Sequence, residues 1–156
     1  MASKTNLDNL DFQIINEMME NAGTSYAELG KRLSVSGGTI HVRMKKLQEE
    51  KIIKGTKIKV DLGRLGYNVS AFIGVFLEKC SQHDDVVAQL KEIPEVVRLN
   101  FTTGAYSMLL EVVCKDIVHL RNVLRGKVQK IEGIGRTETY ISLEEGFSRK
   151  ALISAS

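Results

Sequence analysis

The sequence predicts an α+β fold in two parts, three helices followed by a four-stranded sheet with two helices. Apolar residues recur at helical spacing in three stretches before residue 50, and their period changes from Lys51 onward. Beyond residue 68 the expected order is strand, helix, strand, strand, helix, strand. These observations predict an N-terminal (winged) helix-turn-helix domain of three helices and a C-terminal ferredoxin-like βαββαβ domain.

The first helix is expected to begin at Asp8 or Asn9, because either side chain can accept a hydrogen bond from the opening turn. Asp11 adds negative charge at the positive end of the helix dipole. The residues Asn21, Ala22 and Gly23 end the helix, and Gly23 is suited to a left-handed C-cap. The apolar face of this helix consists of Leu10, Ile14, Ile15, Met18 and Met19.

Residues 25–47 predict two short helices joined by a tight turn. Ser25 and Glu28 have the spacing of a capping box, and the small Gly30 lets another helix approach closely. Residues 34–36 break the first of these helices, and Ser36 can cap the next one. The second helix then places one apolar stripe against a core, formed by Ile40, Met44 and Leu47.

The remaining faces of that second helix are small, hydroxylated and basic, which suits the major groove of double-stranded DNA. We expect phosphate contacts from Lys31, Lys45 and Lys46 and nearby lysines. Base contacts are expected from Ser36, Gly38, Thr39, Val42 and Arg43. Ser25, at the start of the preceding helix, completes the predicted DNA-binding set. The alternative is an ordinary helical hairpin with a solvated basic face.

The distribution of charge favours DNA over that alternative. The formal net charge is only +3 over 156 residues. Residues 1–30 carry one lysine against five acidic residues, and residues 67–156 carry eleven charges of each sign. Residues 31–66 carry ten basic residues against three acidic ones. The positive excess therefore lies on the predicted hairpin and the segment after it, as in a surface that binds a polyanion.

Between the two parts we expect a linker strand or hinge over residues 54–68. Residues 57–61 alternate in strand fashion after Gly55, as a wing beside DNA or a linker strand, and residues 62–67 form the joint. The resulting domain limits are 1–53, 54–68, 69–146 and a tail over 147–156. The tail is expected to be loosely held, although Phe147, Leu152 and Ile153 can dock.

In the second part, strands are expected over 69–79, 95–102, 106–115 and 135–143, and helices over 83–93 and 117–131. Both faces of the first and third strands are apolar, since Phe72 and Phe76 lie opposite a second apolar set. Helices cover only one face of a ferredoxin-like sheet, so the other face must be buried by something else. A second copy of the sheet, related by a twofold axis, is the economical solution.

Several phrases of the sequence are similar to those of the Lrp/AsnC family of transcription regulators. They are LDNLD at the start, ELGKRLSVS, TIHVR and KL in the helical hairpin, LGY at the joint, and TTGAYS in the second part. TIHVR and TTG-x-YS resemble the asparagine-responsive branch of the family. Two positions depart from the family pattern: Gly37 stands where a proline is frequent, and Ser34 where a glycine is frequent.

The resemblance implies a regulator that binds a pseudo-palindromic DNA site and senses a free amino acid between dimers, which commonly assemble into octamers. Backbone N–H groups near a glycine can hold the effector carboxylate, and hydroxyls can bind its polar groups. Ser107 replaces an acid that many relatives use to pair with the ligand ammonium. The alternative is a plain β-turn. The expected effector-binding residues are Thr102, Thr103, Gly104, Ala105, Tyr106, Ser107, Thr137 and Thr139.

Composition restricts the other functions. No apolar run reaches the ~18 residues of a membrane helix, and the first residues lack a secretory signal, so we expect a cytoplasmic protein. Cys80 and Cys114 are far apart, without metal-ligand spacing. No catalytic constellation stands out, so we expect neither an enzyme nor a cofactor. The rival hypotheses are a non-specific architectural protein that compacts DNA and, further behind, an enzyme on a ferredoxin-like fold.

Overall fold

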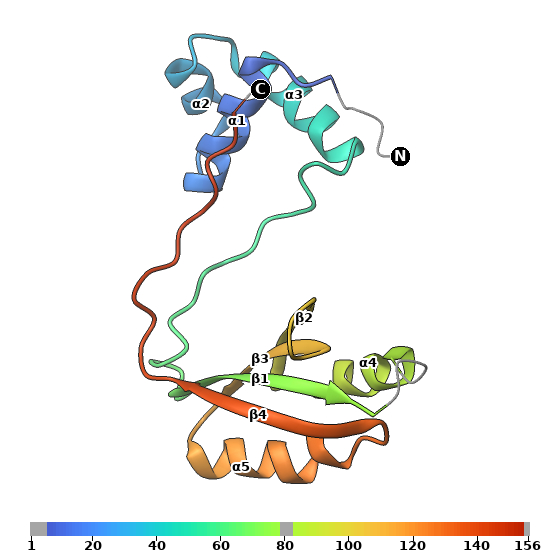
Figure 1. Ribbon diagram of the computed structural model, residues 1–156. Coiled ribbons are helices and arrows are strands. Elements are labelled where there is room, and N and C mark those ends of the chain that lie inside the picture. Colours follow the sequence, from blue (N-terminus) through green and yellow to red (C-terminus); the bar gives the residue numbers. More distant parts are fainter. Residues whose placement is uncertain (1–5, 79–82, 155–156) are drawn as a thin grey trace. The chain divides into compact units, whose positions relative to one another are not determined.

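The computed structural model describes residues 6–78 and 83–154, which form two compact units (Figure 1). Unit 1 holds the described residues up to Lys59 together with those from Phe147 onward. Unit 2 holds the described residues of Val60–Gly146. The segment after residue 146 thus belongs to the helical unit. In the sequence, all residues of the sheet lie between this segment and the three helices.

Unit 1 is built on α1 (Asn9–Glu20), α2 (Tyr26–Arg32) and α3 (Gly37–Glu49). Asp8 caps α1 through a reciprocal capping box with Asp11, since each carboxylate accepts from the backbone N–H of the other residue. Ser36 caps α3, as predicted, by accepting from the backbone N–H of Thr39 at 3.0 Å. The buried core of the unit consists of Ile14, Ile15, Leu29, Ile40, Met44 and Leu47.

Two local predictions in unit 1 are wrong. The capping box of α2 is only half formed: Ser25 accepts from the backbone of Glu28, whose carboxylate instead pairs with Arg32 at 2.6 Å. Gly23 does not adopt a left-handed conformation. The helix ends at Asn21 in extended backbone, and the Asn21 side chain accepts from the Gly23 N–H at 2.9 Å. The Asn21 side chain therefore forms an Asx turn after the helix, while the Asn21 backbone N–H donates to the carbonyl of Glu17.

The linker forms no strand. Residues 54–61 have no regular secondary structure, so the predicted wing or linker strand is absent from this part of the described chain. A turn follows over residues 62–66, in which the N–H of Tyr67 donates to the carbonyl of Leu62 at 2.9 Å. Gly66 has φ +85°, a conformation that favours glycine. Residues 57–61 alternate like a strand, but no segment among the described residues pairs with them.

Unit 2 has the predicted order of strands and helices. Its sheet has the strand order β2-β3-β1-β4, and all three neighbouring pairs are antiparallel. This is the arrangement expected of a ferredoxin-like domain, and it places β1 and β3 at the centre. The elements are β1 (Val69–Leu77), α4 (His83–Lys91), β2 (Val96–Phe101), β3 (Met108–Cys114), α5 (Ile117–Gly126) and β4 (Ile134–Ser142).

The two helices of unit 2 pack on one face of the sheet. Val86 and Leu90 of α4 and Leu120 and Val123 of α5 share one buried cluster with the inward residues of β1 and β3. The helix predicted over 117–131 is shorter: α5 ends at Gly126, and a single 3-10 turn, η2 (Val128–Lys130), follows. Cys114 is a buried, free thiol of this core, whereas Cys80 lies outside the described residues. Within the described chain, none of the helices has the length and apolarity needed to cross a membrane.

Candidate functional site

The turn between α2 and α3 holds the two helices close together. Ser34 has φ +57°, so a serine occupies the left-handed position where the family pattern often has glycine. Gly30 lies directly against the turn: a Cβ built on it would be only 2.7 Å from the carbonyl oxygen of Val35. The N–H of Val35 in turn donates to the carbonyl of Gly30 at 2.9 Å. The approach of α2 to the turn therefore depends on the missing side chain at residue 30.

The outward face of α3 carries most of the residues predicted to contact DNA. Val42 is 66% exposed, so its branched apolar side chain is accessible to a partner. Gly38 and Lys45 are exposed as well, and Thr39 is half-buried. The hydroxyl of Thr39 lies 2.9 Å from that of Ser36, so both hydroxyls are oriented by the helix cap.

Arg43 lies differently from the prediction. Its guanidinium donates to the carboxylates of Asp8 and Asp11 at the start of α1, with a distance of 3.1 Å to the Asp11 oxygen. Asp11 is fully buried, so this ion pair neutralises a carboxylate that has lost its water. Arg43 therefore ties α3 to α1 in this structure, and a base contact would require it to leave both acids.

This ion pair is reflected in the titration of Asp8. The backbone N–H of Asp11 and, next, the guanidinium of Arg43 hold the pKa of the Asp8 carboxyl below its ordinary value of 3.8. The same two carboxylates raise the pKa of Arg43 above its ordinary value.

An Asp8→Asn variant tests this effect, because asparagine caps helices about as well as aspartate but carries no charge. Because the folded pKa of Asp8 is lowered, its stabilising contribution is complete above pH 3.8 and is lost as the pH falls through the lower folded value. The melting temperature of the variant should therefore lie below that of the wild type at pH 6 and approach it below pH 3.8. Thermal unfolding between pH 6 and pH 3 measures the difference, and a gap that stays constant over this range would contradict it.

The predicted lysines differ in how far they are already engaged. Lys31 is exposed on α2, and Lys45 is exposed with a weak ion pair to Glu49 at 3.8 Å. Lys46 is half-buried and donates to the backbone carbonyl of Asn6 at 3.4 Å. Ser25 is exposed, but its hydroxyl caps α2. Lys31 and Lys45 are accordingly the lysines of the predicted set with the most accessible charge.

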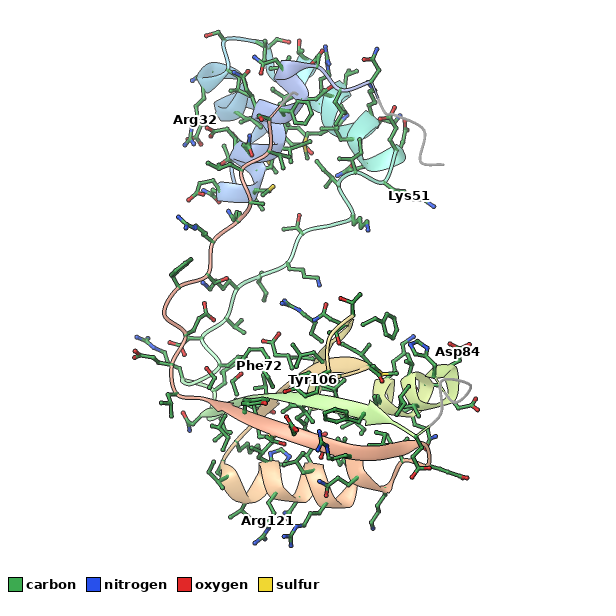
Figure 2. The ribbon with its side chains drawn as sticks, viewed as in Figure 1. Arg32, Lys51, Phe72, Asp84, Tyr106 and Arg121 are labelled. Atoms are coloured by element: carbon green, nitrogen blue, oxygen red, sulfur yellow. The ribbon has the colours of Figure 1, made fainter. Side chains whose placement is uncertain are left out.

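In unit 2, residues 102–107 connect β2 to β3, and Tyr106 dominates this loop. Its ring lies over Gly74 of β1, where a Cβ would approach ring atoms to 2.5 Å, and it meets Phe76 edge-on at a centroid distance of 5.1 Å. Figure 2 shows Tyr106 and Phe72 on the side of the sheet away from Arg121 of α5. The loop thus places its aromatic side chain on the open face of the sheet.

The hydroxyl of Tyr106 is part of a polar cluster that the sequence did not predict. It donates to the carboxylate of Glu138 at 2.9 Å and lies 2.6 Å from the hydroxyl of Tyr140, which also donates to Glu138 at 3.0 Å. The hydrogen bond with Tyr140, followed in size of effect by the one with Glu138, raises the pKa of Tyr106 above its ordinary range. The hydroxyls of Tyr106 and Tyr140 lower the pKa of Glu138. Glu138 is therefore a fixed carboxylate beside the predicted effector loop.

The other loop residues are ordered mainly by the backbone. The hydroxyl of Thr102 donates to the carbonyl of Tyr106, and the N–H of Ser107 donates to Val75 at 2.9 Å. The segment between them, Thr103, Gly104 and Ala105, is exposed. Its polar groups are therefore accessible to a small molecule.

Thr137 and Thr139 do not lie with Tyr106. They are opposite Val75 and Ile73 of β1, whose side chains are buried under the helices, and paired residues point to the same face. Thr137 accepts a hydrogen bond from Gln129 at 3.0 Å, and Thr139 lines a hollow of about 300 Å³ beside α5. Within one chain, these threonines therefore lie on the opposite side of the sheet from the ring of Tyr106, and their part in effector binding stays a prediction. Alternation along β4 places Glu138 on the face opposite to Thr137 and Thr139, and the sequence analysis did not single out Glu138.

Over residues 6–78 and 83–154, no group of three or more His, Cys, Asp or Glu side chains is arranged to hold a metal ion. The acid–base groups that do converge are Glu95, His119 and Lys127. Glu95 accepts from Lys127 at 2.7 Å and lies 3.1 Å from a ring nitrogen of His119. Burial raises the pKa of Glu95, but hydrogen bonds from Lys127, its own backbone and His119 more than compensate and lower it. These contacts join the start of β2 to α5 and its following turn, as a structural ion pair does.

Two family models match the chain. The model described as "Winged helix-turn-helix DNA-binding" matches residues 7–54, and the model described as "Lrp/AsnC ligand binding domain" matches residues 70–152. The chain is 42% identical over 144 residues to "Regulatory protein AsnC" of Haemophilus influenzae, covering 92% of this chain and 96% of the relative. It is 43% identical over 143 residues to the protein of the same name from Escherichia coli K12, covering 92% and 94%.

Solved structures show the same fold. "Structure of E.coli AsnC" superimposes with a TM-score of 0.89 at 41% identity, covering 94% of this chain and 99% of that one. A regulatory protein from M. tuberculosis, complexed with L-methionine, has a TM-score of 0.88 at 24% identity and coverages of 94% and 99%. A transcriptional regulator from Neisseria meningitidis in complex with L-Met has a TM-score of 0.86 at 22% identity, with 96% of each chain covered.

Proposed function

The chain belongs to the Lrp/AsnC family of transcription regulators, and we propose that it binds a specific DNA site through α3 and responds to a free amino acid bound by unit 2. The observation that carries the DNA-binding proposal is the outward face of α3. This face combines an exposed Val42, an accessible Lys45 and a helix N-terminus that Ser36 caps. It lies in the segment of the chain that carries the excess of positive charge. Because a DNA-binding regulator acts on the chromosome, we propose a cytoplasmic location. We also propose that the protein has no enzymatic activity of its own.

Within this proposal, Gly38, Thr39 and Val42 are the residues closest to base edges. The branched apolar side chain of Val42 is suited to the methyl group of thymine, and Gly38 allows the start of the helix to approach the groove floor. Lys31 and Lys45 contact phosphates, and Lys46 does so once it leaves the carbonyl of Asn6. Ser25 and Ser36 support these contacts from the two helix caps. Arg43 positions α3 against α1 and contributes less to base contacts than the sequence suggested.

A pair of substitutions on α3 separates base contacts from phosphate contacts. Val42→Ala removes two methyl groups, so it should reduce the preference for the specific site by about 1–2 kcal/mol and leave the salt dependence unchanged. Lys45→Ala should weaken binding to specific and random DNA alike and reduce the slope of log K against log salt by about 1. Titrations at four salt concentrations measure both quantities. If the two variants lose affinity in the same way, α3 does not lie in the groove as proposed.

For the effector we propose a free amino acid held by Thr102, Thr103, Gly104, Ala105, Tyr106 and Ser107. The exposed backbone at Gly104 suits a carboxylate. Ser107 offers no charge for the ammonium group, and the carboxylate of Glu138 is already paired with Arg136 at 2.9 Å, so the loop hydroxyls and carbonyls are left to bind it. Relatives solved with L-methionine make an amino acid the ligand class to test first.

Thr137 and Thr139 fit this proposal only in an assembly. Because they lie on the helix-covered side of the sheet and Tyr106 on the open side, one ligand contacts both sets most readily when they come from different copies. The open face carries Phe72 and Tyr140, which are 39% and 50% exposed, and a second sheet would cover them. We therefore propose a homodimer through this face, with effector bound between dimers of a higher assembly such as an octamer.

Thermal unfolding with each of the twenty amino acids tests the effector proposal. A ligand that binds only the folded protein raises the melting temperature, and at a hundred times its Kd the stabilisation is about 2.7 kcal/mol. We expect one amino acid, or a few of similar chemistry, to produce such a shift. If none of the twenty changes the melting temperature at millimolar concentration, unit 2 does not sense an amino acid.

A further inference from the structure

The C-terminal segment, defined here as residues 147–154, is held on unit 1 by a specific anchor on α1. The side-chain amide of Asn16 donates to the carbonyl of Ile153 at 2.8 Å, and its oxygen accepts from the N–H of Ile153 at 3.3 Å. One side chain thus satisfies both backbone groups of a single residue, as a neighbouring strand would. The Ile153 side chain packs against the buried core of the helical unit.

The rest of the segment contributes little to this attachment. Lys150 lies 3.7 Å from Glu20 of α1, an exposed ion pair of small energetic value. Among the described residues from 143 to 154, Ile153 is the single one that is not exposed. Leu152 is the contrast, since it is larger than most of its neighbours but 92% exposed. The segment is therefore attached at one residue rather than along its length.

The path of the chain explains why this anchor matters for the connection between the two units. The chain leaves unit 1 after Lys59, forms all of unit 2, and returns to unit 1 at Phe147, so two segments link the units. The first link contains residues 54–61, which have no regular structure. A single link of that kind leaves a domain free to reorient widely. The second link begins directly at the end of β4, the strand that carries Glu138 and Tyr140.

We propose that the C-terminal segment is a strap, anchored by Ile153 on Asn16, that limits the orientations the DNA-binding unit can adopt and couples it to β4. The docking itself does not depend on the proposed function, whereas its effect on DNA binding does. In a dimer, two strapped DNA-binding units reach half-sites over a narrow range of spacings. Release of the straps removes this restriction and lowers the effective concentration of the second unit at its own half-site.

Amide hydrogen exchange of the full-length protein tests the docking. The N–H of Ile153 should exchange more slowly than that of Leu152, and Asn16→Ala should accelerate the exchange of Ile153 about tenfold, since two hydrogen bonds are lost. Asn16 is half-buried on the surface of α1, so this variant should retain its fold. Leu152→Ala is the matched control and should leave the exchange of Ile153 unchanged. Equal exchange rates of Ile153 in the wild type and in Asn16→Ala would overturn the proposal.

A series of DNA duplexes with different spacings between the half-sites tests the effect of the strap on DNA binding. DNA with two half-sites is lengthened by about 5 base pairs, half a helical turn, which places the second half-site on the opposite side of the duplex. The insertion should weaken wild-type binding about tenfold more than it weakens binding of Asn16→Ala or Ile153→Ala, with Leu152→Ala behaving like the wild type. Identical spacing profiles for all four proteins would reject the strap. Absence of any DNA binding by the wild type would reject the proposed function instead, and the exchange experiment would still decide whether the segment docks.

Discussion

A Gly30→Ala variant should lose DNA binding while unit 2 stays folded. The new methyl group would lie 2.7 Å from the carbonyl oxygen of Val35, 3.1 Å from the carbonyl carbon of Ser36 and 3.0 Å from the backbone nitrogen of Gly37. All three are backbone atoms of the turn, so relief requires α2 and α3 to move relative to each other. Overpacking of this kind costs about 1–3 kcal/mol, more than the helix propensity that alanine gains. Displacement of α3 also removes Ser36 and Val42 from their positions on the proposed DNA face.

Gly38→Ala is the matched control for the effect on stability alone, because Gly38 itself belongs to the proposed DNA face. A Cβ at Gly38 would contact only the hydroxyl of Ser36, at an ordinary 3.6 Å, within the same helical hairpin. Alanine in a helix should raise the stability of unit 1 by about 0.5–1 kcal/mol. Denaturant unfolding of both variants measures the contrast in stability, and DNA titration of Gly30→Ala against the wild type measures the loss of binding. A Gly30→Ala protein as stable as Gly38→Ala, with wild-type affinity, would show that the close approach of α2 to the turn is not required.

The second large effect is expected at Gly74, in the middle of β1. A valine side chain there would occupy the space of the Tyr106 ring, whose atoms lie 2.5–2.7 Å from the position of a Cβ. The ring would be forced outward, and its hydroxyl would leave Glu138 and Tyr140. We expect a loss of about 1–3 kcal/mol in stability and loss of the response to the effector, because Tyr106 belongs to the predicted effector loop.

A double variant makes this prediction specific. Gly74→Val combined with Tyr106→Ala should be less destabilised than the sum of the two single variants, because removing the ring makes room for the valine. Gly126→Ala serves as the control, since a Cβ at the end of α5 meets nothing within 4 Å. Strictly additive effects at residues 74 and 106 would contradict the contact between them. Urea unfolding of the wild type, the two single variants, the double variant and the control provides the comparison.

The sequence predicted those features of the fold that depend on neighbouring residues. The caps at Asp8 and Ser36 and the buried stripe of α3 involve partners within a few positions, so propensity and spacing are enough to predict them. The order of strands and helices followed from periodicity in the same way. The prediction of a left-handed cap at Gly23 is wrong because the chain leaves α1 in extended backbone at Asn21, whose side chain accepts from the Gly23 N–H.

The remaining features depend on partners that are distant in sequence. Arg43 pairs with acids 35 and 32 positions earlier, and no local pattern distinguishes such a residue from one that faces DNA. Alternation placed Thr137 and Thr139 on one face of β4, but only the register with β1 shows which face that is. The cluster of Tyr106, Glu138 and Tyr140 depends on the same register.

Binding to the DNA upstream of its own gene, compared with random DNA of equal length, tests the central claim most directly. The measurement is made across a salt series, with and without each amino acid. We expect the specific site to be preferred by at least ~10³ at moderate salt, and one amino acid to change that affinity. Salt-sensitive binding without preference would favour a non-specific architectural protein. The absence of binding under every condition would contradict the assignment of α3 as a recognition helix.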